Sequence, residues 1–281
     1  KYGAYGDLTC VEAMPGLPPG TVIDRATADQ SVMATTAEAH GAVDGKPAVL
    51  VNSFGRGRAV LLNTFVGRYE LCQADGTSRP WTSLYRWIFQ QAGVATDRVE
   101  VSAGGQPAIG ARRVHFRNGD MGILGVRKNG LGFETYPVKL DFNLPEARHV
   151  YDMRAGKHLG SGRTFRAEFE ALETRFFALL PYPVKAARLD LPKTAARGQV
   201  LKGKVTIETE VGKPDPHAVF VQVRGPGGQD LDWFEQKLWV EKGKGELRLP
   251  IAANEAAGAY TVRVRDIPTG MAAEQVFEVK P

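Results

Sequence analysis

Apolar and polar residues alternate with a period of two along most of this chain. In "RTFRAEFEAL" the residues Phe165, Ala167 and Phe169 face one side, and charged residues face the other. Such alternation predicts half-buried β-strands. Only "SLYRWIFQQAG", residues 83–93, has helical spacing, and Gly93 suits the position just after a helix end. The pattern therefore predicts a mainly β protein with one clear helix.

Turn signals connect these strands into hairpins. In "PAVLVNSFGRGRAVLLN", residues 47–63, two apolar runs flank Gly-Arg-Gly. A phosphate-binding loop would open a helix and carry a Lys-Ser/Thr pair. Here the next run, "AVLLNTF", is strand-like, so the glycines predict a hairpin turn rather than a nucleotide site. Asn118-Gly119 and Ala155-Gly156 predict two further hairpins.

Changes in texture divide the chain into three segments. Residues 1–96 contain the helix and form a partial α/β segment, whereas residues 97–184 contain only strands and predict a small β-sandwich. Residues 185–281 hold short strands such as "VLKGKVTIETEV" and "GAYTVRVRDIPTG", separated by Gly/Pro-rich turns. This rhythm predicts an immunoglobulin-like sandwich. The expected fold is thus mainly β, with an α/β segment followed by two antiparallel β-sandwich domains.

The composition and the charge distribution exclude two classes of partner. The 281 residues are 43% hydrophobic and 24% charged, which is typical of a globular protein, and no apolar run is long enough for a membrane span. The net charge is +5, but basic and acidic residues number 8 and 8, 13 and 10, and 15 and 13 in the three segments. Nucleic-acid binding needs a concentrated cationic surface. We therefore expect neither a nucleic-acid partner nor a membrane span.

The motifs of common enzyme sites are missing. The chain has no G-x-S-x-G sequence, and Cys10 and Cys72 are not in the turn that exposes a nucleophile, so a Cys–His pair with His40 is disfavoured. The two cysteines form either one disulfide, if the protein is exported, or two separate buried thiols. The scattered histidines do not have metal-ligand spacing. We expect no metal and no cofactor.

Two groups of side chains are candidate ligands or catalysts. His149, Asp152 and His158 share one hairpin, but alternation puts His149 and Asp152 on opposite faces. Glu168 and Glu170 share a strand face, either as an acid/base pair or, as we favour, as a solvated face.

Carbohydrate binding is the best-supported ligand hypothesis for single residues. "DLDWFE" gathers Asp230 and Asp232 near Trp233, which suits a calcium loop, a sugar-stacking platform or an ordinary solvated loop. Trp233 and Trp239 are the first candidates to stack on a sugar, followed by Trp81 if it is exposed. The alternative for each is core packing, which we expect for Trp87.

Two stretches resemble a known family. "GKPAVLVNSFGRGRAVLLNTFVGRYE" followed by "LYRWIFQQAGV" resembles the end of the amidotransferase-like domain of bacterial glycoside hydrolases of the β-galactosidase trimerisation type. "HVYDMRAGKHLG" and "TRFFALLPYPV" resemble the small β-sandwich that follows in these enzymes. Together the stretches cover residues 40–183. "GAYTVRVRDIPTG" is similar to the closing strands of bacterial immunoglobulin-like or macroglobulin-like modules.

The resemblance implies a region without the active site. The family's catalytic carboxylates lie on a (β/α)-barrel, which this sequence does not contain, so no catalytic residue is carried over. It also implies that residues 1–96 are half of an amidotransferase-like domain, completed by further sequence or by another chain. We therefore expect an extracellular or periplasmic, non-catalytic C-terminal region of a larger glycoside-hydrolase-like protein, acting as a scaffold, in oligomerisation, or near carbohydrate. The alternatives are a structural or adhesive cell-surface protein and a small glycan-active enzyme using Asp152, Glu168, Glu170 or the Asp230–Glu235 loop.

Overall fold

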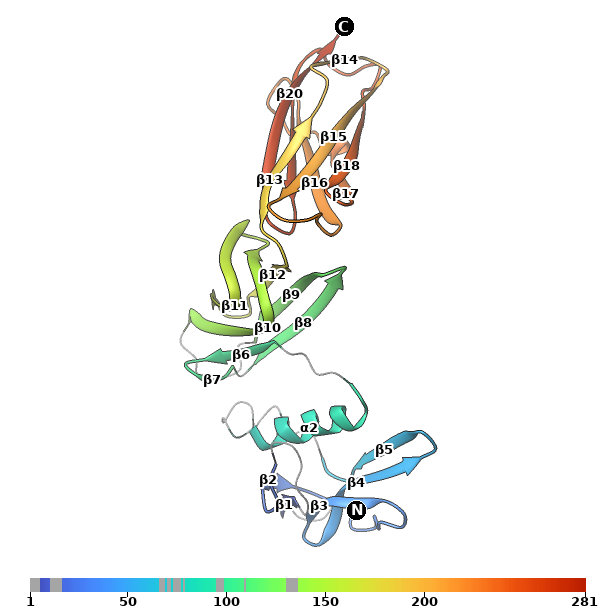
Figure 1. The fold of residues 1–281 in the computed structure, drawn as a ribbon, viewed down its shortest axis with the longest axis vertical. Coiled ribbons are helices and arrows are strands. Elements are labelled where there is room, and N and C mark those ends of the chain that lie inside the picture. Colours follow the sequence, from blue (N-terminus) through green and yellow to red (C-terminus); the bar gives the residue numbers. More distant parts are fainter. Residues whose placement is uncertain are drawn as a thin grey trace. The chain divides into compact units, whose positions relative to one another are not determined.

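A computed structural model describes residues 6–10, 17–65, 69, 72, 77, 79–94, 99–108, 110–129 and 136–281. These residues are mainly β-strand and form two compact units, one up to residue 94 and one from residue 99 onward (Figure 1). The predicted boundary at 96 lies outside the described residues, and the boundary at 184 falls within the second unit. No helix in the described part of the chain has the length and hydropathy to cross a membrane.

The first unit is built on one antiparallel sheet with strand order β2-β1-β3-β4-β5. Strands β4 and β5 form the predicted hairpin, in which Gly55 has a φ of 57° and Phe54 lies opposite Gly57. A whole amidotransferase-like domain would have a parallel, doubly wound sheet, and the described strands do not form one. The strands are β1 Gly6–Cys10, β2 Val22–Ala26, β3 Glu38–Val43, β4 Lys46–Phe54 and β5 Gly57–Leu62.

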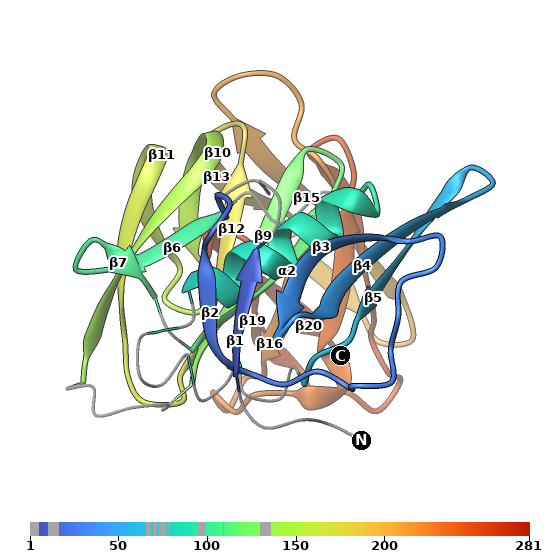
Figure 2. The ribbon, with the colours of Figure 1, turned by 90° about the horizontal axis from the view of Figure 1, so that it is seen from below.

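The predicted helix is α2, Arg79–Gln91, and it covers one face of this sheet (Figure 2). Its buried residues, Trp81, Leu84 and Trp87, recur every three positions and pack against buried residues of the strands. The helix begins four residues before the predicted start because Pro80 is tolerated in a first turn. Gly93 has a φ of 69° just after the end, as predicted.

The first half of the second unit is a seven-stranded sheet with order β7-β6-β10-β12-β9-β8, in which β11 also pairs with β10. Strand β10 is irregular between Asn143 and Arg148; it pairs with β6 before this point and with β12 after it. The sheet therefore folds around its own core, which includes Leu124, Phe142 and Phe177. The strands are β6 Glu100–Ala103, β7 Gln106–Pro107, β8 Ala111–Asn118, β9 Met121–Lys128, β10 Val138–Asp152, β11 Lys157–Phe169 and β12 Thr174–Leu180.

The second half, here called the C-terminal sandwich, contains two sheets. One has the order β13-β15-β18 and the other the order β14-β20-β19-β16-β17. The immunoglobulin-like label stays a prediction, whereas the β-sandwich is as expected, with antiparallel strand pairs apart from the parallel pair β14–β20. The strands are β13 Val184–Asp190, β14 Thr194–Ala196, β15 Val200–Thr209, β16 His217–Arg224, β17 Gln236–Val240, β18 Lys244–Pro250, β19 Gly258–Asp266 and β20 Ala272–Lys280, with a short 3₁₀ helix η2 at Asp232–Phe234.

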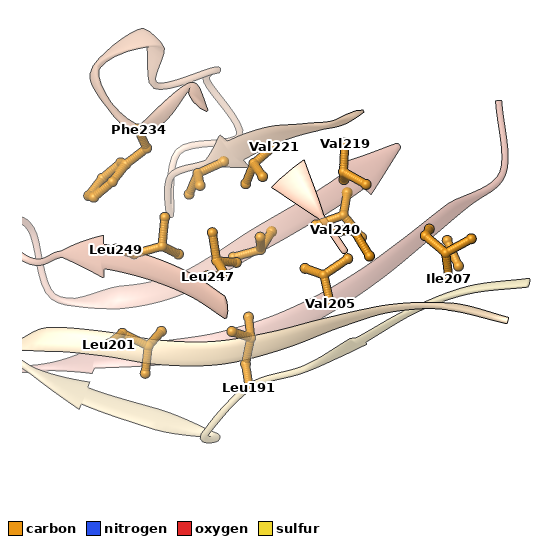
Figure 3. Close-up of a cluster of buried hydrophobic side chains, with 14 of the residues drawn as sticks. Leu191, Leu201, Val205, Ile207, Val219, Val221, Phe234, Val240, Leu247 and Leu249 are labelled. Atoms are coloured by element: carbon orange, nitrogen blue, oxygen red, sulfur yellow. The ribbon is translucent and has the colours of Figure 1, made fainter. Parts of the chain in front are cut away.

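Valine and leucine side chains from both sheets fill the interior of the C-terminal sandwich (Figure 3). Each fully buried side chain of this size contributes about 1.5–3 kcal/mol to the free energy of folding. Met121, Tyr151, Ala178 and Leu180 of the seven-stranded sheet join the same buried cluster. This shared core is why residues 99–281 form one compact unit, although the sheets change near residue 184.

Candidate functional site

In the C-terminal sandwich, the sheet β14-β20-β19-β16-β17 carries Trp239 on its outer face. Trp239 is the most exposed aromatic residue on the strands of this sandwich. In β17 the residues Lys237 and Trp239 point outward, and Val240 is buried. Trp239 lies directly across from Ala218 of β16, and Lys237 across from Phe220. We call these four residues and Arg265, which lies across from Phe220 on β19, the tryptophan face.

Trp239 is 62% exposed. The neighbouring strand places only the methyl group of Ala218 beside it, so a bulky side chain does not cover the indole from that strand. Lys237 and Arg265 add hydrogen-bond donors on either side of Phe220. The sequence could not decide whether Trp239 or its neighbours Leu238 and Val240 face the core. The structure turns Trp239 outward because Leu238 is half-buried and Val240 fully buried.

Trp233 is exposed as well, at 69%, but it belongs to η2 rather than to the sheet. Its neighbour Phe234 is buried and holds the 3₁₀ turn to the core. Trp239 follows Trp233 by six positions, which spans at most about 20 Å of strand. The two indoles therefore belong to different elements, η2 and β17.

The carboxylates near Trp233 do not gather into an ion site. The side chain of Asp230 is exposed and accepts a hydrogen bond from Arg224 Nε at 3.2 Å, and Asp232 is exposed at the start of η2. Within the described residues, no group of three His, Cys, Asp or Glu side chains is placed to hold a metal ion. The loop is arranged as a solvated loop whose one prominent apolar surface is the ring of Trp233.

The other tryptophans are core residues. Trp81 is 1% exposed and Trp87 is also buried, so Trp81 does not meet the condition of exposure that a sugar platform requires. His40 packs on Trp87 with 5.2 Å between ring centroids. Cys10 and Cys72 are free thiols in the same buried cluster, which leaves the second of the two sequence alternatives. Burial raises the pKa of Cys10, the opposite of what an activated nucleophile needs.

Asp152 is a structural carboxylate. It is buried, forms an ion pair with Arg175, and accepts hydrogen bonds from the backbone N–H groups of Arg154 at 3.0 Å and Ala155 at 2.9 Å. Burial alone would raise the pKa of Asp152, but these backbone and arginine hydrogen bonds, together with the charge of Arg175, hold it below its ordinary value. A carboxylate with all its partners inside the fold is not placed for acid/base catalysis.

Glu168 and Glu170 lie on the solvated face of β11 or next to it, as the alternation predicts. The carboxylate of Glu168 lies 3.4 Å from the ammonium of exposed Lys139. His149 and His158 stack with 5.6 Å between ring centroids, whereas Asp152 points into the sheet's interior. The structure therefore does not bring this histidine pair and Asp152 to one ion.

A buried polar network joins residues that no sequence pattern singles out. His217 Nδ1 lies 2.8 Å from Asp266 Oδ1, both residues are fully buried, and Thr269 Oγ1 donates to the other carboxylate oxygen. His217 Nε2 lies 3.2 Å from the hydroxyl of Tyr182, which accepts a hydrogen bond from the Asp215 N–H at 2.7 Å. Burial and the nearby Asp215 carboxylate raise the pKa of Tyr182. The network resembles a proton relay in composition, but His217, Asp266 and Thr269 are buried and only Asp215 is partly exposed.

The network joins the two halves of the second unit. Asp215 Oδ1 accepts a hydrogen bond from the Asp120 N–H at 3.1 Å, and Asn118 Nδ2 donates to the Pro216 carbonyl at 2.9 Å. Tyr151 adds a third link by accepting the Val184 N–H at 3.0 Å. Its role is therefore mechanical. The only sequence signal was Tyr182 between two prolines.

Comparisons with known proteins find only distant structural similarity. Neither a protein-family model nor a curated protein matches the sequence. A β-glycosidase from Bacteroides vulgatus is similar in structure, with a TM-score of 0.27 and 14% identity over 69% of this chain and 26% of that one. A β-glucosidase from Listeria innocua in complex with glucose gives a TM-score of 0.26 and 13% identity over 36% and 16%. A superoxide reductase (neelaredoxin) from Ignicoccus hospitalis gives 0.27 and 9% over 34% and 82%.

The chain thus has distant structural similarity to β-glycosidases and covers about a quarter or less of their length. At these scores the likeness describes shared β-rich parts alone.

Proposed function

We propose that this chain is a non-catalytic region of a larger glycoside-hydrolase-like protein, where it serves as a scaffold and contacts carbohydrate. The single observation that carries the carbohydrate contact is the exposed indole of Trp239 on the tryptophan face. The sequence resemblance at residues 40–183 supports the larger context. Binding to polysaccharides agrees with the extracellular or periplasmic location that the resemblance leads us to expect.

The tryptophan face has the parts that a sugar needs. The flat indole offers an apolar surface to the C–H face of a pyranose ring. Lys237 and Arg265 offer donors to hydroxyl groups at the edge of the ring. The strands fix the spacing of these groups, so little side-chain freedom beyond that of Lys237 and Arg265 is lost on binding.

The carboxylates support a non-catalytic role. Asp152 is buried with its partners, Glu168 faces Lys139 in solvent, and Asp230 is held by Arg224. Each of these carboxylates is paired with a basic side chain, whereas glycoside hydrolysis uses two carboxylates that flank the scissile bond.

Affinity electrophoresis against soluble neutral polysaccharides, for example β-1,4-galactan, xylan and mixed-linkage β-glucan, tests the proposal. Trp239→Ala should weaken binding at least about tenfold, a loss of some 1.4 kcal/mol. The matched control is Phe54→Ala, which removes an exposed aromatic ring from the β4–β5 hairpin and should change nothing.

Three results would refute the proposal. One is that no polysaccharide of the panel binds, and another is that Trp239→Ala binds as the wild type does. The third is hydrolysis of a panel member by this chain with a bell-shaped pH dependence, which would indicate an acid/base pair within it.

A further inference from the structure

A second surface lies on the seven-stranded sheet, on the face turned away from the sheet's own core. Three rows of residues cross strands β8, β9 and β12 there: Arg112–Arg127–Thr174, Val114–Gly125–Phe176 and Phe116–Ile123–Ala178. We call the outward residues of these rows that reach solvent, together with Arg154, the arginine–aromatic face.

This surface is charged with one sign only. Its charged residues are Arg112 and Arg127 of the first row and Arg154, and none of the rows contains an acidic residue. Arg127 is exposed and lies directly opposite Arg112 on the neighbouring strand.

The middle of the face is flat and apolar. Gly125 leaves room for the ring of Phe176: a Cβ at this glycine would lie 3.1 Å from a ring carbon. The guanidinium carbon of Arg154 lies 5.9 Å from the centroid of the same ring. Beside it, Val114 and Phe116 are 53% and 54% exposed. Exposed apolar side chains that adjoin one another in this way mark interaction sites.

At one end of this sheet face, the C-terminal sandwich covers the side chains. Met121, Ala178 and Leu180 continue the rows and are buried in the shared core with the C-terminal sandwich. The arginine–aromatic face continues directly from this interface but is open. Neither Arg127 nor Arg154 forms an ion pair within the described residues.

We propose that the arginine–aromatic face binds an acidic polysaccharide whose sugars carry carboxylate groups. Arg127 and Arg154 supply planar, doubly donating groups that fit a carboxylate. Phe116, Val114 and the Phe176 ring supply the apolar surface on which the sugar ring lies. The face holds few arginines, and the charges elsewhere are balanced, which suits a glycan with one carboxylate per sugar better than a nucleic acid with many phosphate contacts.

The inference is independent of the tryptophan face and has its own test. Isothermal titration of the whole chain with oligogalacturonate is compared with titration with the same oligomer after methyl esterification, which removes the charge and keeps the sugar. The acid form should bind, the ester at least about tenfold more weakly, and added salt should weaken the acid form.

Variants locate the site. Arg127→Gln and Phe116→Ser should each weaken oligogalacturonate binding several-fold. The control Arg188→Gln removes another exposed charge, whose partner is Glu208, and should have little effect. Trp239→Ala should retain binding, so failure of one surface does not hide the other. Because the changed side chains are exposed, thermal unfolding of each variant should match the wild type.

Equal affinity for the acid and the ester would overturn the inference, as would equal losses in Arg127→Gln and Arg188→Gln. If Phe116→Ser retains its affinity, the sugar ring does not lie on Phe116. Tighter binding of a poly-glutamate peptide or of oligothymidylate than of oligogalacturonate would show that the face serves another class of polyanion.

Discussion

The buried carboxylate of Asp266 offers the sharpest test of how the second unit is held together. Replacing Asp266 by alanine leaves the His217 Nδ1–H and the Thr269 hydroxyl in a fully buried place without their acceptor. It also frees His217 from the position in which its other nitrogen meets Tyr182. The backbone bonds of Asp266 with Met271 and Gly270 remain.

The expected loss follows from these contacts. Two buried donors are left without a partner, and each costs about 1–3 kcal/mol. Asp266→Ala should therefore lower the unfolding free energy of the second unit by about 2–6 kcal/mol. With an m-value of about 2 kcal/mol/M, the urea midpoint should fall by about 1–3 M.

Hydrogen exchange followed by mass spectrometry is the suitable assay, because peptides from β16 and β19 report on this unit separately from β3 and β4 of the first. The control is Arg188→Ala, which breaks the solvent-exposed pair with Glu208 and should cost less than about 1 kcal/mol. Equal effects of the two variants would refute the reasoning, since the network would then add nothing beyond a surface ion pair.

Two further predictions concern other parts of the same unit. Because the pKa of Asp152 is lowered in the folded state, its contribution to stability is present above its unfolded pKa of about 3.9 and is lost as the pH falls through the folded value. Asp152→Asn should flatten the acid limb of stability measured by urea unfolding from pH 5 to 2, whereas Asp141→Asn, at an exposed pair with Arg166, should retain it. At Gly270, with a φ of 77°, a Cβ would lie 2.2 Å from the Gly156 Cα, so Gly270→Ala should lower the melting temperature far more than Gly228→Ala, which has a φ of 80° and open space. Equal melting temperatures of the two glycine variants would show that the turns can separate freely.

Local patterns predicted local structure well. The hairpins at Gly55, Asn118-Gly119 and Ala155-Gly156 are present, because a turn residue and its flanking strands are neighbours in sequence. The helix was found for the same reason. Its start was misplaced because the apolar spacing begins at Trp81, before the stretch that showed it most clearly.

Features made of distant residues were out of reach. Tyr182, His217 and Asp266 are far apart in sequence, and each alone is a common residue type in a β protein. Trp239 stood between two apolar neighbours, so alternation alone could not show which side faced the core. The arginine–aromatic face likewise depends on the register that sets Arg112 opposite Arg127 and Phe176 over Gly125.

The short linker between the two halves of the second unit fixes how far apart the two proposed binding surfaces lie. Only Pro181–Pro183 separates β12 from β13, and Tyr182 in its middle is fastened to His217 and Asp215. The spacing of the tryptophan face and the arginine–aromatic face is therefore built in rather than left to a flexible tether. A polymer long enough to touch both would meet the second at a high effective concentration. Chain length, and not only sugar identity, would then decide which polysaccharides are retained.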